Sequence, residues 1–591
     1  MEKGQRLELI IEDMTKEGQG VGKSNGFAVF VKDTVVGDHV IAELTKVKKN
    51  YAFGHIVEMI ESSEDRMQPQ CQYAGNCGGC AYNAMRYEGQ LAVKEKQVRD
   101  KLQRLGDIEN PKVRSIVPME TPFRYRNKAA MPVWAGGIIT RKGGIIENLG
   151  APTVGFYRAK SHDVVDCYDC LLQSEPAMAA AEVLRQFMSS DHITAYDPKW
   201  EKGLLRHLVV KTAFGTGEVM VILVINGKGI PNAAKLVEML DDAIYSLPPS
   251  DNGVEYSLES VVVNINKGKK GSLPGSIFGA ENVTIAGKPA ILETSGGLSF
   301  EISPLAFYQV NPVQMERLYN LAMEYAALRG GETVLDLYCG VGTIGLFAAK
   351  AGAGRVIGIE SVKGAVIDAN RNAVINGFVN VRYVCGKAED ELPKLLCDDL
   401  DDQGLRVDHA DVVFLDPPRA GCDERLLETV VKVAPSRVVY VSCDPATLAR
   451  DVKFLTARGY NFEEATPVDM FPWTAEVETV VMLSHKKPDS VINVKVEFGE
   501  GEGKVPLDNI AKRAEAYKPK ERVTYKMIKG YIEAKYGFKV HTAYIAEVKR
   551  DLGLPMYDAP NAVEKLKQPR KHPTAEKVEA IKDALKHFEV I

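Results

Sequence analysis

The chain has 591 residues, of which 26% are charged and 45% hydrophobic, and its formal net charge is −5. A prior of about 150 residues per domain predicts three or four domains, and the composition is that of a globular protein rather than a fibrous or disordered one. No apolar run approaches the roughly 20 residues that span a bilayer, and Met1–Arg6 lacks the apolar stretch of a signal peptide. We therefore expect a cytoplasmic protein without a membrane partner.

Residues 1–61 read as a series of short strands separated by turns, which indicates a small OB-like β-barrel. Three of the strands are expected at 27–31, 40–44 and 55–60. Lys46, Lys48 and Lys49 lie close to Tyr51 and Phe53. Basic residues among aromatics fit a nucleic-acid surface, and they fit a solvated loop beside two core aromatics equally well.

Three cysteines follow within ten residues: Cys71, Cys77 and Cys80. Their C-x5-C-x2-C spacing is close to the plant-type ferredoxin pattern, whereas zinc sites more often have two C-x2-C pairs. Cys167 or Cys170 would supply a fourth ligand. Clustered cysteines in a long cytosolic-type chain indicate metal or catalysis rather than disulfides. Because the spacing is close to the ferredoxin pattern, we favour an iron–sulfur cluster over a zinc site or unliganded thiols.

The next segments predict a helix over 85–105 and then mostly strands over 120–305, for example at 217–225 and 260–265. Basic and aromatic residues alternate at 123–128 and stand together at 205–207. They could contact phosphate or stack on bases, although exposed arginine on a strand is also ordinary.

A ligand-binding loop is predicted at Thr333–Gly345, which reads as a strand, a Gly-rich turn and the start of a helix. The next strand ends in Glu360, 20 residues after Gly340. Glycines allow a ligand to approach closely, and the acid can bind ribose hydroxyls. This pattern alone also fits a nicotinamide dinucleotide, but Asp416-Pro-Pro-Arg419 at a strand end favours S-adenosylmethionine.

Cys443 and Glu478 carry the expected chemistry. Cys443 follows an apolar run at the carboxyl end of a predicted strand, where open α/β sheets bind their ligands. A thiolate that adds to C6 of uracil activates C5 toward an electrophilic methyl group, and a base must then remove the C5 proton. A cysteine and a carboxylate beside a methyl donor therefore predict carbon methylation of a pyrimidine.

Together with Phe307-Tyr-Gln309-Val-Asn311, these motifs resemble those of the RNA uracil-5 methyltransferases, specifically the iron–sulfur, TRAM-domain branch that modifies 23S ribosomal RNA. The resemblance covers roughly residues 1–485. It implies that Cys443 is the nucleophile and Glu478 the base. The residues it implies for S-adenosylmethionine are Gln309, Tyr338, Gly340, Gly342, Thr343, Glu360 and Asp416. Those it implies for a 4Fe–4S cluster are Cys71, Cys77, Cys80 and Cys170.

The expected fold is therefore a multidomain α/β protein that binds RNA. Its parts are a TRAM barrel over 1–61, a β-rich central domain with the cluster over 62–305, a Rossmann-like methyltransferase domain over 306–485, a linker over 486–510 and a basic helical domain over 511–591. The resemblance also implies that the helix within 85–120 packs on the catalytic domain. We expect the cluster, which the reaction does not need for electrons, to brace the RNA-binding face.

The tail is not explained by the resemblance. From residue 484 onward it has 22 Lys and Arg against 16 Asp and Glu, which indicates an anionic partner. Helices are expected at 523–536, with Thr524 as N-cap, at 542–552 and at 574–588. This small helical unit could contact nucleic acid or a ribosomal protein, or could simply pack. No oligomeric state is predicted.

Several alternatives stay open. Glu476 stands where the family usually has His, so it either shares the base role, raises the pKa of Glu478, or faces solvent or a basic group in the substrate. The substrate could be the T-loop uridine of tRNA. A cytosine-5 enzyme is less favoured because Ser442 precedes the cysteine. A non-catalytic iron–sulfur protein that binds RNA or senses redox state is a further alternative.

Overall fold

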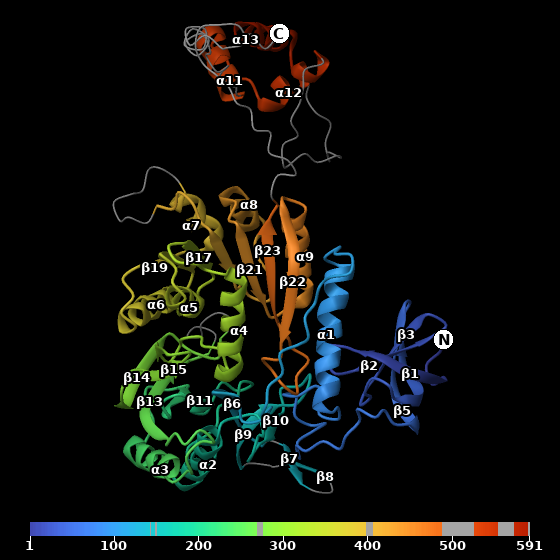
Figure 1. The fold of residues 1–591 in the computed structure, drawn as a ribbon, viewed down its shortest axis with the longest axis vertical. Helices are drawn as coiled ribbons and strands as arrows, with labels where there is room; N and C mark the ends of the chain where they lie inside the picture. The colour runs from blue at the N-terminus through green and yellow to red at the C-terminus, as the bar shows by residue number, and fades with distance from the viewer. Residues whose placement is uncertain are drawn as a thin grey trace. The chain divides into compact units, whose positions relative to one another are not determined.

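The computed structural model describes residues 1–136, 138–141, 144–147, 151–268, 276–396, 406–486, 525–552 and 573–588. The chain divides into two compact units, Met1–Lys487 and Pro488–Ile591 (Figure 1). Within the described residues, no helix is both long and apolar enough to cross a membrane.

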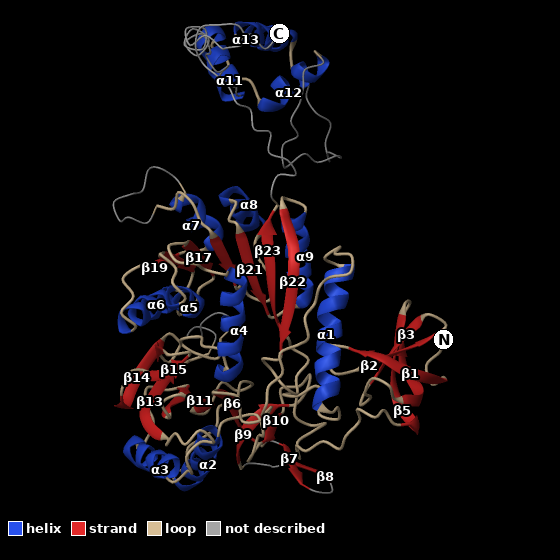
Figure 2. Ribbon diagram, in the orientation of Figure 1, coloured by secondary structure: helices blue, strands red, loops and turns tan. Residues whose placement is uncertain are grey.

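The N-terminal strands close into a barrel in the order β1-β2-β3-β5-β4. They are β1 (Arg6–Met14), β2 (Gly20–Ser24), β3 (Phe27–Val31), β4 (His39–Val47) and β5 (Tyr51–Glu61). Figure 2 draws strands in red and helices in blue. Alternate side chains such as Leu9, Ile11 and Val29 fill the interior, as the two-residue period of a strand requires. A Cβ on Gly20 would lie 2.1 Å from the hydroxyl of Thr34, so only glycine fits there. The expected barrel is confirmed.

Helix α1 (Tyr87–Arg104) follows the cysteine segment. Its Val98 and Leu102 are buried in the same cluster as Leu448 and Leu455 of α9 (Pro445–Thr456). In Figure 1 the helix runs alongside α9 and strand β22 (Tyr460–Val468). Helix α1 therefore joins the N-terminal part of the chain to the C-terminal half of the first unit.

The central region forms a sheet of nine described strands in the order β14-β13-β12-β11-β6-β9-β10-β7-β8. They are β6 (Lys128–Ala135), β7 (Ile138–Arg141), β8 (Gly144–Glu147), β9 (Pro152–Tyr157), β10 (Val164–Asp166), β11 (Leu205–Thr212), β12 (Glu218–Ile225), β13 (Ser257–Ile265) and β14 (Glu281–Gly287). One face packs against α2 and α3, and the other contributes Val209, Ile222 and Val262 to a core shared with the following domain.

Helices α2 (Glu175–Ser190) and α3 (Ala233–Tyr245) add to the mostly β pattern that we expected for this region. Both carry local signals. Ser174 precedes α2, Pro176 lies in its first turn, and the helix is rich in alanine. In α3, Leu236, Leu240 and Ile244 are buried at four-residue intervals.

A hairpin of β15 (Ile291–Ser295) and β16 (Leu298–Ile302) leads to α4 (Pro312–Ala326). The side chain of Asn311 caps α4 by accepting a hydrogen bond from the backbone N–H of Gln314 at 3.2 Å. Its amide also donates to the carbonyl of Met470 at 2.9 Å, so the start of α4 is bound to the loop before strand β23 (Glu478–His485).

The last large sheet has the order β19-β18-β17-β20-β21-β23-β22, with β23 antiparallel to both of its neighbours. Its strands are β17 (Thr333–Leu337), β18 (Arg355–Glu360), β19 (Val381–Cys385), β20 (Val412–Leu415), β21 (Arg437–Ser442), β22 (Tyr460–Val468) and β23 (Glu478–His485). The remaining helices are α5 (Thr343–Lys350), α6 (Lys363–Ile375), α7 (Ala388–Leu395) and α8 (Glu424–Val433).

Helices cover both faces of this sheet because its parallel strands are apolar on both sides. Val334, Val356 and Val412 point into the core with α4, α5 and α6. Their neighbours in sequence, such as Leu335 and Ile357, point into the core with α1, α7, α8 and α9. This is the doubly wound arrangement, in which ligands bind at the carboxyl ends of the strands.

The second unit contains α11 (Tyr525–Tyr536), α12 (Thr542–Asp551) and α13 (Ala575–His587) around a small core with Ile532, Ile545 and Ile581. These helices match the three expected in the tail. Thr524 and most of the expected linker lie outside the described residues.

Candidate functional site

The Gly-rich loop follows β17 directly. Gly340 and Gly342 have φ of 55° and 83°, a left-handed conformation that favours glycine. A Cβ on Gly342 would lie 2.5 Å from the ring of Tyr383. The backbone N–H of Gly340 donates to Oε2 of Glu360 at 3.2 Å, so the loop and the acid at the end of β18 lie together. Tyr338, before them, also has a positive φ of 65°.

Two buried acids stand at the ends of neighbouring strands β17 and β20. Burial raises the pKa of Asp336 and of Asp416 to about 7 each. One oxygen of Asp336 accepts from the N–H of Gly345 at 2.8 Å, and within the described structure the other has no partner. We did not single out Asp336 from the sequence, although an acid inside an apolar strand just before a Gly-rich turn is itself a signal.

Tyr319 of α4 connects several of the residues predicted for the methyl donor. Its hydroxyl accepts a hydrogen bond from Thr343 at 3.2 Å and is also hydrogen-bonded to Gln309. Burial, reinforced by the nearby carboxylate of Asp416, raises its pKa. Tyr319 belongs to no sequence motif, because its role depends on how α4 packs over the sheet.

Cys443 and Glu478 lie at adjacent strand ends. Ser442 is paired with Thr479 in the antiparallel ladder of β21 and β23, so Cys443 and Glu478 occupy the next position of the register. Burial raises the pKa of Glu478 to about 8, and the carboxylates of Asp416 and Glu476 add to this effect. Burial and then Glu478 raise the pKa of Cys443 to about 12, while Arg419 opposes the shift.

Glu476 forms an ion pair with Arg419. Nη2 of Arg419 lies 3.2 Å from Oε1 of Glu476. Glu476 thus pairs with a basic group of the protein itself, which we did not predict, and it raises the pKa of Glu478, which was one of the alternatives for this position. Arg419 lowers the pKa of both Cys443 and Glu478, so it is a cation in a group of acidic side chains.

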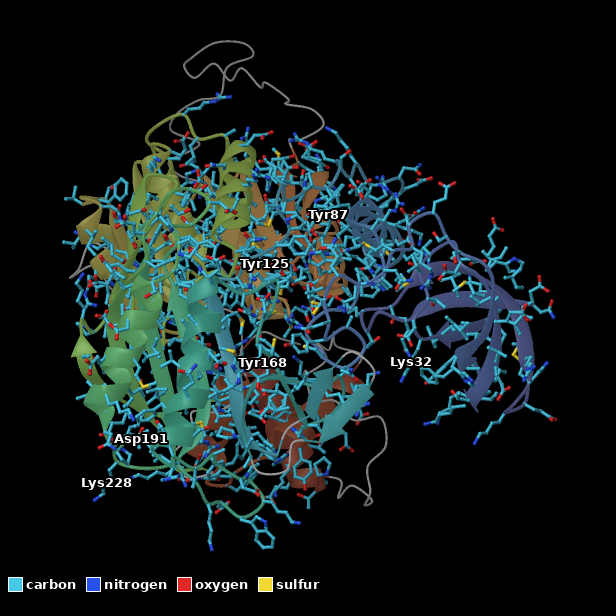
Figure 3. All side chains as sticks on the ribbon, turned by 90° about the horizontal axis from the view of Figure 1, so that it is seen from below. Lys32, Tyr87, Tyr125, Tyr168, Asp191 and Lys228 are labelled. Carbon is cyan, nitrogen blue, oxygen red and sulfur yellow. The ribbon has the colours of Figure 1, made fainter. Side chains whose placement is uncertain are left out.

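The loop between β22 and β23 is held by a buried ion pair. Nζ of Lys94 in α1 lies 2.5 Å from Oδ1 of Asp469, and both side chains are fully buried. Nζ of Lys94 also donates to the carbonyl of Phe471 at 3.0 Å. The hydroxyl of Tyr87 donates to Asp469 at 2.7 Å, and that of Tyr125 donates to the carbonyl of Pro472 at 3.0 Å. Figure 3 labels Tyr87 and Tyr125 among the side chains.

Five cysteines surround a second site. A cavity of about 370 Å³ is lined by Cys71, Cys77, Cys80, Cys167 and Cys170, together with Arg126, Lys128 and others. Burial raises the pKa of Cys77 to about 11. A hydrogen bond between Cys167 and Cys170 raises the pKa of the former and lowers that of the latter.

Within the described residues, no three His, Cys, Asp or Glu side chains lie close enough to hold a single metal ion. The cavity is far larger than the roughly 30 Å³ that one water molecule occupies. The thiols line this space together with Arg126 and Lys128, whose side chains could offset the charge of thiolates.

Three aromatic residues of the barrel lie outside its core, whereas Phe27 packs against it. Phe30, Tyr51 and Phe53 form a cluster with ring centroids 5.5–5.6 Å apart, and Tyr51 is 37% exposed. Lys46 is paired with Phe53 in the register of β4 and β5. The sequence left open whether these rings are core or surface, and the surface arrangement is the one found.

Comparison with known proteins agrees with this geometry. Residues 294–486 match the family model described as tRNA (uracil-5-)-methyltransferase, and residues 1–57 match the TRAM domain. An uncharacterized RNA methyltransferase of Caldanaerobacter subterraneus is 44% identical over 481 residues, which are 81% of this chain and 98% of that protein. One of Halalkalibacterium halodurans is 41% identical over 480 residues, 81% of this chain and 97% of that protein.

Among solved structures, the tRNA (uracil-54, C5)-methyltransferase of Pyrococcus abyssi, in complex with S-adenosyl-L-homocysteine, is similar with a TM-score of 0.59. It is 27% identical, and the match covers 81% of this chain and all of that one. From the Gly-rich loop, the paired strand ends and these relatives, we conclude that the chain belongs to the S-adenosylmethionine-dependent RNA uracil-5 methyltransferase family, with an N-terminal TRAM domain.

Proposed function

We propose that this protein methylates C5 of a uridine in 23S ribosomal RNA, with Cys443 as the nucleophile and Glu478 as the base. The observation that carries the proposal is the placement of Cys443 and Glu478 at adjoining ends of β21 and β23, beside Asp416. The target base must leave its stack to reach them, which costs a few kcal/mol and least in loops.

The reaction has three steps at these side chains. The sulfur of Cys443 forms a bond to C6, and the electron pair of the C5–C6 double bond becomes available at C5. Bound S-adenosylmethionine supplies the methyl group that C5 takes up. Glu478 then removes the C5 proton, the double bond reforms, and the thiolate of Cys443 leaves.

The protonation states of the free protein fit these roles in part. With a pKa of about 8, Glu478 is mostly protonated at pH 7, and it must lose this proton before it acts as a base. With a pKa of about 12, Cys443 needs help to form a thiolate. Arg419 stabilises both anions, and we assign it that supporting role.

The methyl donor would be held by residues around the Gly-rich loop and the strand ends. They are Gln309, Tyr338, Gly340, Gly342, Thr343, Glu360 and Asp416. Glu360, which already accepts from Gly340, is suited to ribose hydroxyls. The buried carboxyl of Asp416 is suited to a donor with positive charge.

We further propose a 4Fe–4S cluster on Cys71, Cys77, Cys80 and Cys170, with Cys167 as a neighbouring thiol. Support comes from the common cavity and its two cationic wall residues. Iron content and visible absorption after anaerobic reconstitution test the ligand set. Cys170→Ala should lose the cluster, whereas Cys167→Ala should keep it; the reverse result would exchange the two assignments.

None of the nine cysteines in the described structure forms a disulfide, which fits a reducing cytoplasm.

A second candidate substrate is a tRNA uridine, because the similar Pyrococcus abyssi enzyme acts on tRNA and the match covers 81% of this chain. The test is methyl transfer from labelled S-adenosylmethionine to total RNA, with Cys443→Ala as control. Labelled 5-methyluridine in large-subunit ribosomal RNA supports the first candidate, and label in tRNA supports the second. Absence of label from all RNA would refute both candidates and favour a non-catalytic protein that binds RNA or senses redox state.

A further inference from the structure

Trp473 lies in the loop between β22 and β23, five residues before Glu478, and its backbone is unusual. Its φ of 69° is an outlier for a bulky residue, and such strain persists only where surrounding contacts enforce it. Its N–H donates to Oε1 of Gln90 at 2.9 Å. Its carbonyl accepts from the N–H groups of Ala81 and Tyr82 at 3.0 and 3.1 Å.

These two donors directly follow Cys80 in the sequence. Their hydrogen bonds to one carbonyl therefore connect the cysteine segment with the loop that leads to Glu478. On the same loop, Ala475 is buried in a small cluster with Tyr82. The loop is thus attached to the residues after Cys80 at two points.

The side chain of Trp473 makes a second connection. Its Nε1–H donates to the carbonyl of Pro122 at 2.7 Å, and its ring stacks on Phe123 with centroids 5.2 Å apart. The ring belongs to a cluster that includes Cys80 and Cys170. A cavity of about 30 Å³ beside the large one is lined by Trp473 with Cys71, Cys80 and Cys170.

We infer that Trp473 is a positioning residue through which the cysteine site holds the loop of Glu478 in place. This inference rests on the proposed function of Glu478. The proposed 4Fe–4S cluster, when bound, would hold Cys80 in place. The N–H groups of Ala81 and Tyr82, which follow Cys80, hold the carbonyl of Trp473. The loop can then present Glu478 to the C5 proton. Changes at the cysteine site should therefore slow the removal of the C5 proton more than they weaken RNA binding. This differs from our expectation from the sequence, in which the site only braces the RNA-binding face.

The chemistry allows this step to be isolated. If Glu478 is misplaced, Cys443 still adds to C6 and C5 still takes the methyl group, but the C5 proton stays. The methylated RNA then remains covalently attached to Cys443. In a single turnover of the reconstituted full-length protein with labelled S-adenosylmethionine, it should be seen as a labelled, denaturant-stable complex of protein and RNA.

We expect Trp473→Ala to accumulate this complex and to release product at least tenfold more slowly, while RNA affinity stays within about twofold. Trp473→Phe keeps the stacking and should recover part of the release rate. Trp200→Ala removes a tryptophan that is 66% exposed and serves as control. Wild-type release in Trp473→Ala, or a loss of activity that follows RNA affinity without any complex, would overturn the inference.

A second readout does not depend on activity. With Trp134→Phe and Trp200→Phe, fluorescence reports on Trp473 alone, since the chain has three tryptophans. Removal of iron by a chelator should shift its emission and slow product release together. An unchanged emission would refute the connection even if Trp473→Ala fails to fold. If wild type forms neither 5-methyluridine nor the complex, the proposed function itself fails.

Discussion

Lys16 of the barrel forms an ion pair with Asp444, the residue that follows Cys443 in sequence. Nζ of Lys16 lies 2.5 Å from Oδ2 of Asp444, although 428 residues separate them in the chain. The other oxygen of Asp444 accepts from the N–H of Ala446 at 2.8 Å and caps α9. The barrel therefore contacts the segment that presents the proposed nucleophile.

Lys16→Ala should affect catalysis more than stability. The side chain of Lys16 is 52% exposed, and such pairs contribute at most about 1 kcal/mol to the free energy of unfolding. We expect Tm to change little and kcat/KM for RNA to fall by about tenfold, equivalent to about 1.4 kcal/mol. Lys23→Ala, which breaks an exposed pair with Glu12 on the surface of the barrel, is the control. Equal effects of both variants would argue against a role for the contact with Asp444.

Glu476→Gln should shift the pH dependence of product release. Release requires ionised Glu478, so its rate should rise with pH through about 8 in the wild type. The substitution removes a like charge and frees Arg419, and both changes lower the pKa of Glu478. The rising limb should therefore move to lower pH, and in Arg419→Gln it should move to higher pH. Single-turnover rates between pH 6 and about 9.5 test this; unmoved limbs would exclude Glu478 as the titrating base.

Stability of the ligand-free protein should fall as pH rises from about 5 to about 8. Asp336, Asp416 and Glu478 have pKa values raised to about 7, 7 and 8, so the native state keeps protons that the unfolded chain loses near pH 4. Their stabilising contribution is complete below the unfolded pKa and is lost as pH passes the folded pKa. Each adds a slope of about 1.4 kcal/mol per pH unit within its window. Urea unfolding at several pH values should show a shallower slope for Asp416→Asn; an unchanged slope would contradict its raised pKa.

Lys94→Met should strongly destabilise the first unit. The substitution leaves Asp469 buried without its cation, which costs about 3–5 kcal/mol. The double variant Lys94→Met/Asp469→Asn should recover part of this loss, because no buried charge remains unpaired. Lys96→Met on the same helix breaks only partly exposed pairs with Asp13 and Asp100, and should cost less than about 1 kcal/mol. Denaturant unfolding compares the three; equal losses at both lysines would show that burial of the pair is unimportant.

Removal of residues 488–591 should leave the first unit intact. The second unit has its own core around Ile532 and Ile581. The two relatives match this chain over 97–98% of their own length, yet the match covers only 81% of this chain. We expect the Tm of the first unit to stay within about 2 °C, and affinity for S-adenosylmethionine to be unchanged. Calorimetry and titration of both chains test this. A large drop in Tm would show that the tail supports the fold.

Local patterns were enough to predict the barrel and the Gly-rich loop, and to single out the cysteines that line one cavity. A turn that needs a positive φ, as at Gly342, and a strand with an apolar run can both be recognised from a few consecutive residues. The same holds for α2, whose Ser174 and Pro176 could have been recognised. These features depend on neighbours in sequence.

Long-range pairs could not be predicted in this way. Lys94 in a Lys-rich helix gives no sign that it is buried against Asp469, because the partner lies 375 residues away. The pairing of Glu476 with Arg419 depends on how the loop before β23 packs over the end of β20. Tyr319 likewise becomes part of the site only when α4 covers the sheet.

The distance in sequence between Lys94 and Asp469 also has a consequence for synthesis. At 5–20 residues per second, a ribosome needs about 20–75 s to add the 375 residues between them. Throughout this time α1 carries a lysine whose burial site does not yet exist. All five cysteines of the large cavity have been made by residue 170, whereas Trp473, which lies against two of them, is added near the end of the first unit. These cysteines are therefore synthesised and exposed to the surroundings of the nascent chain before this wall is in place.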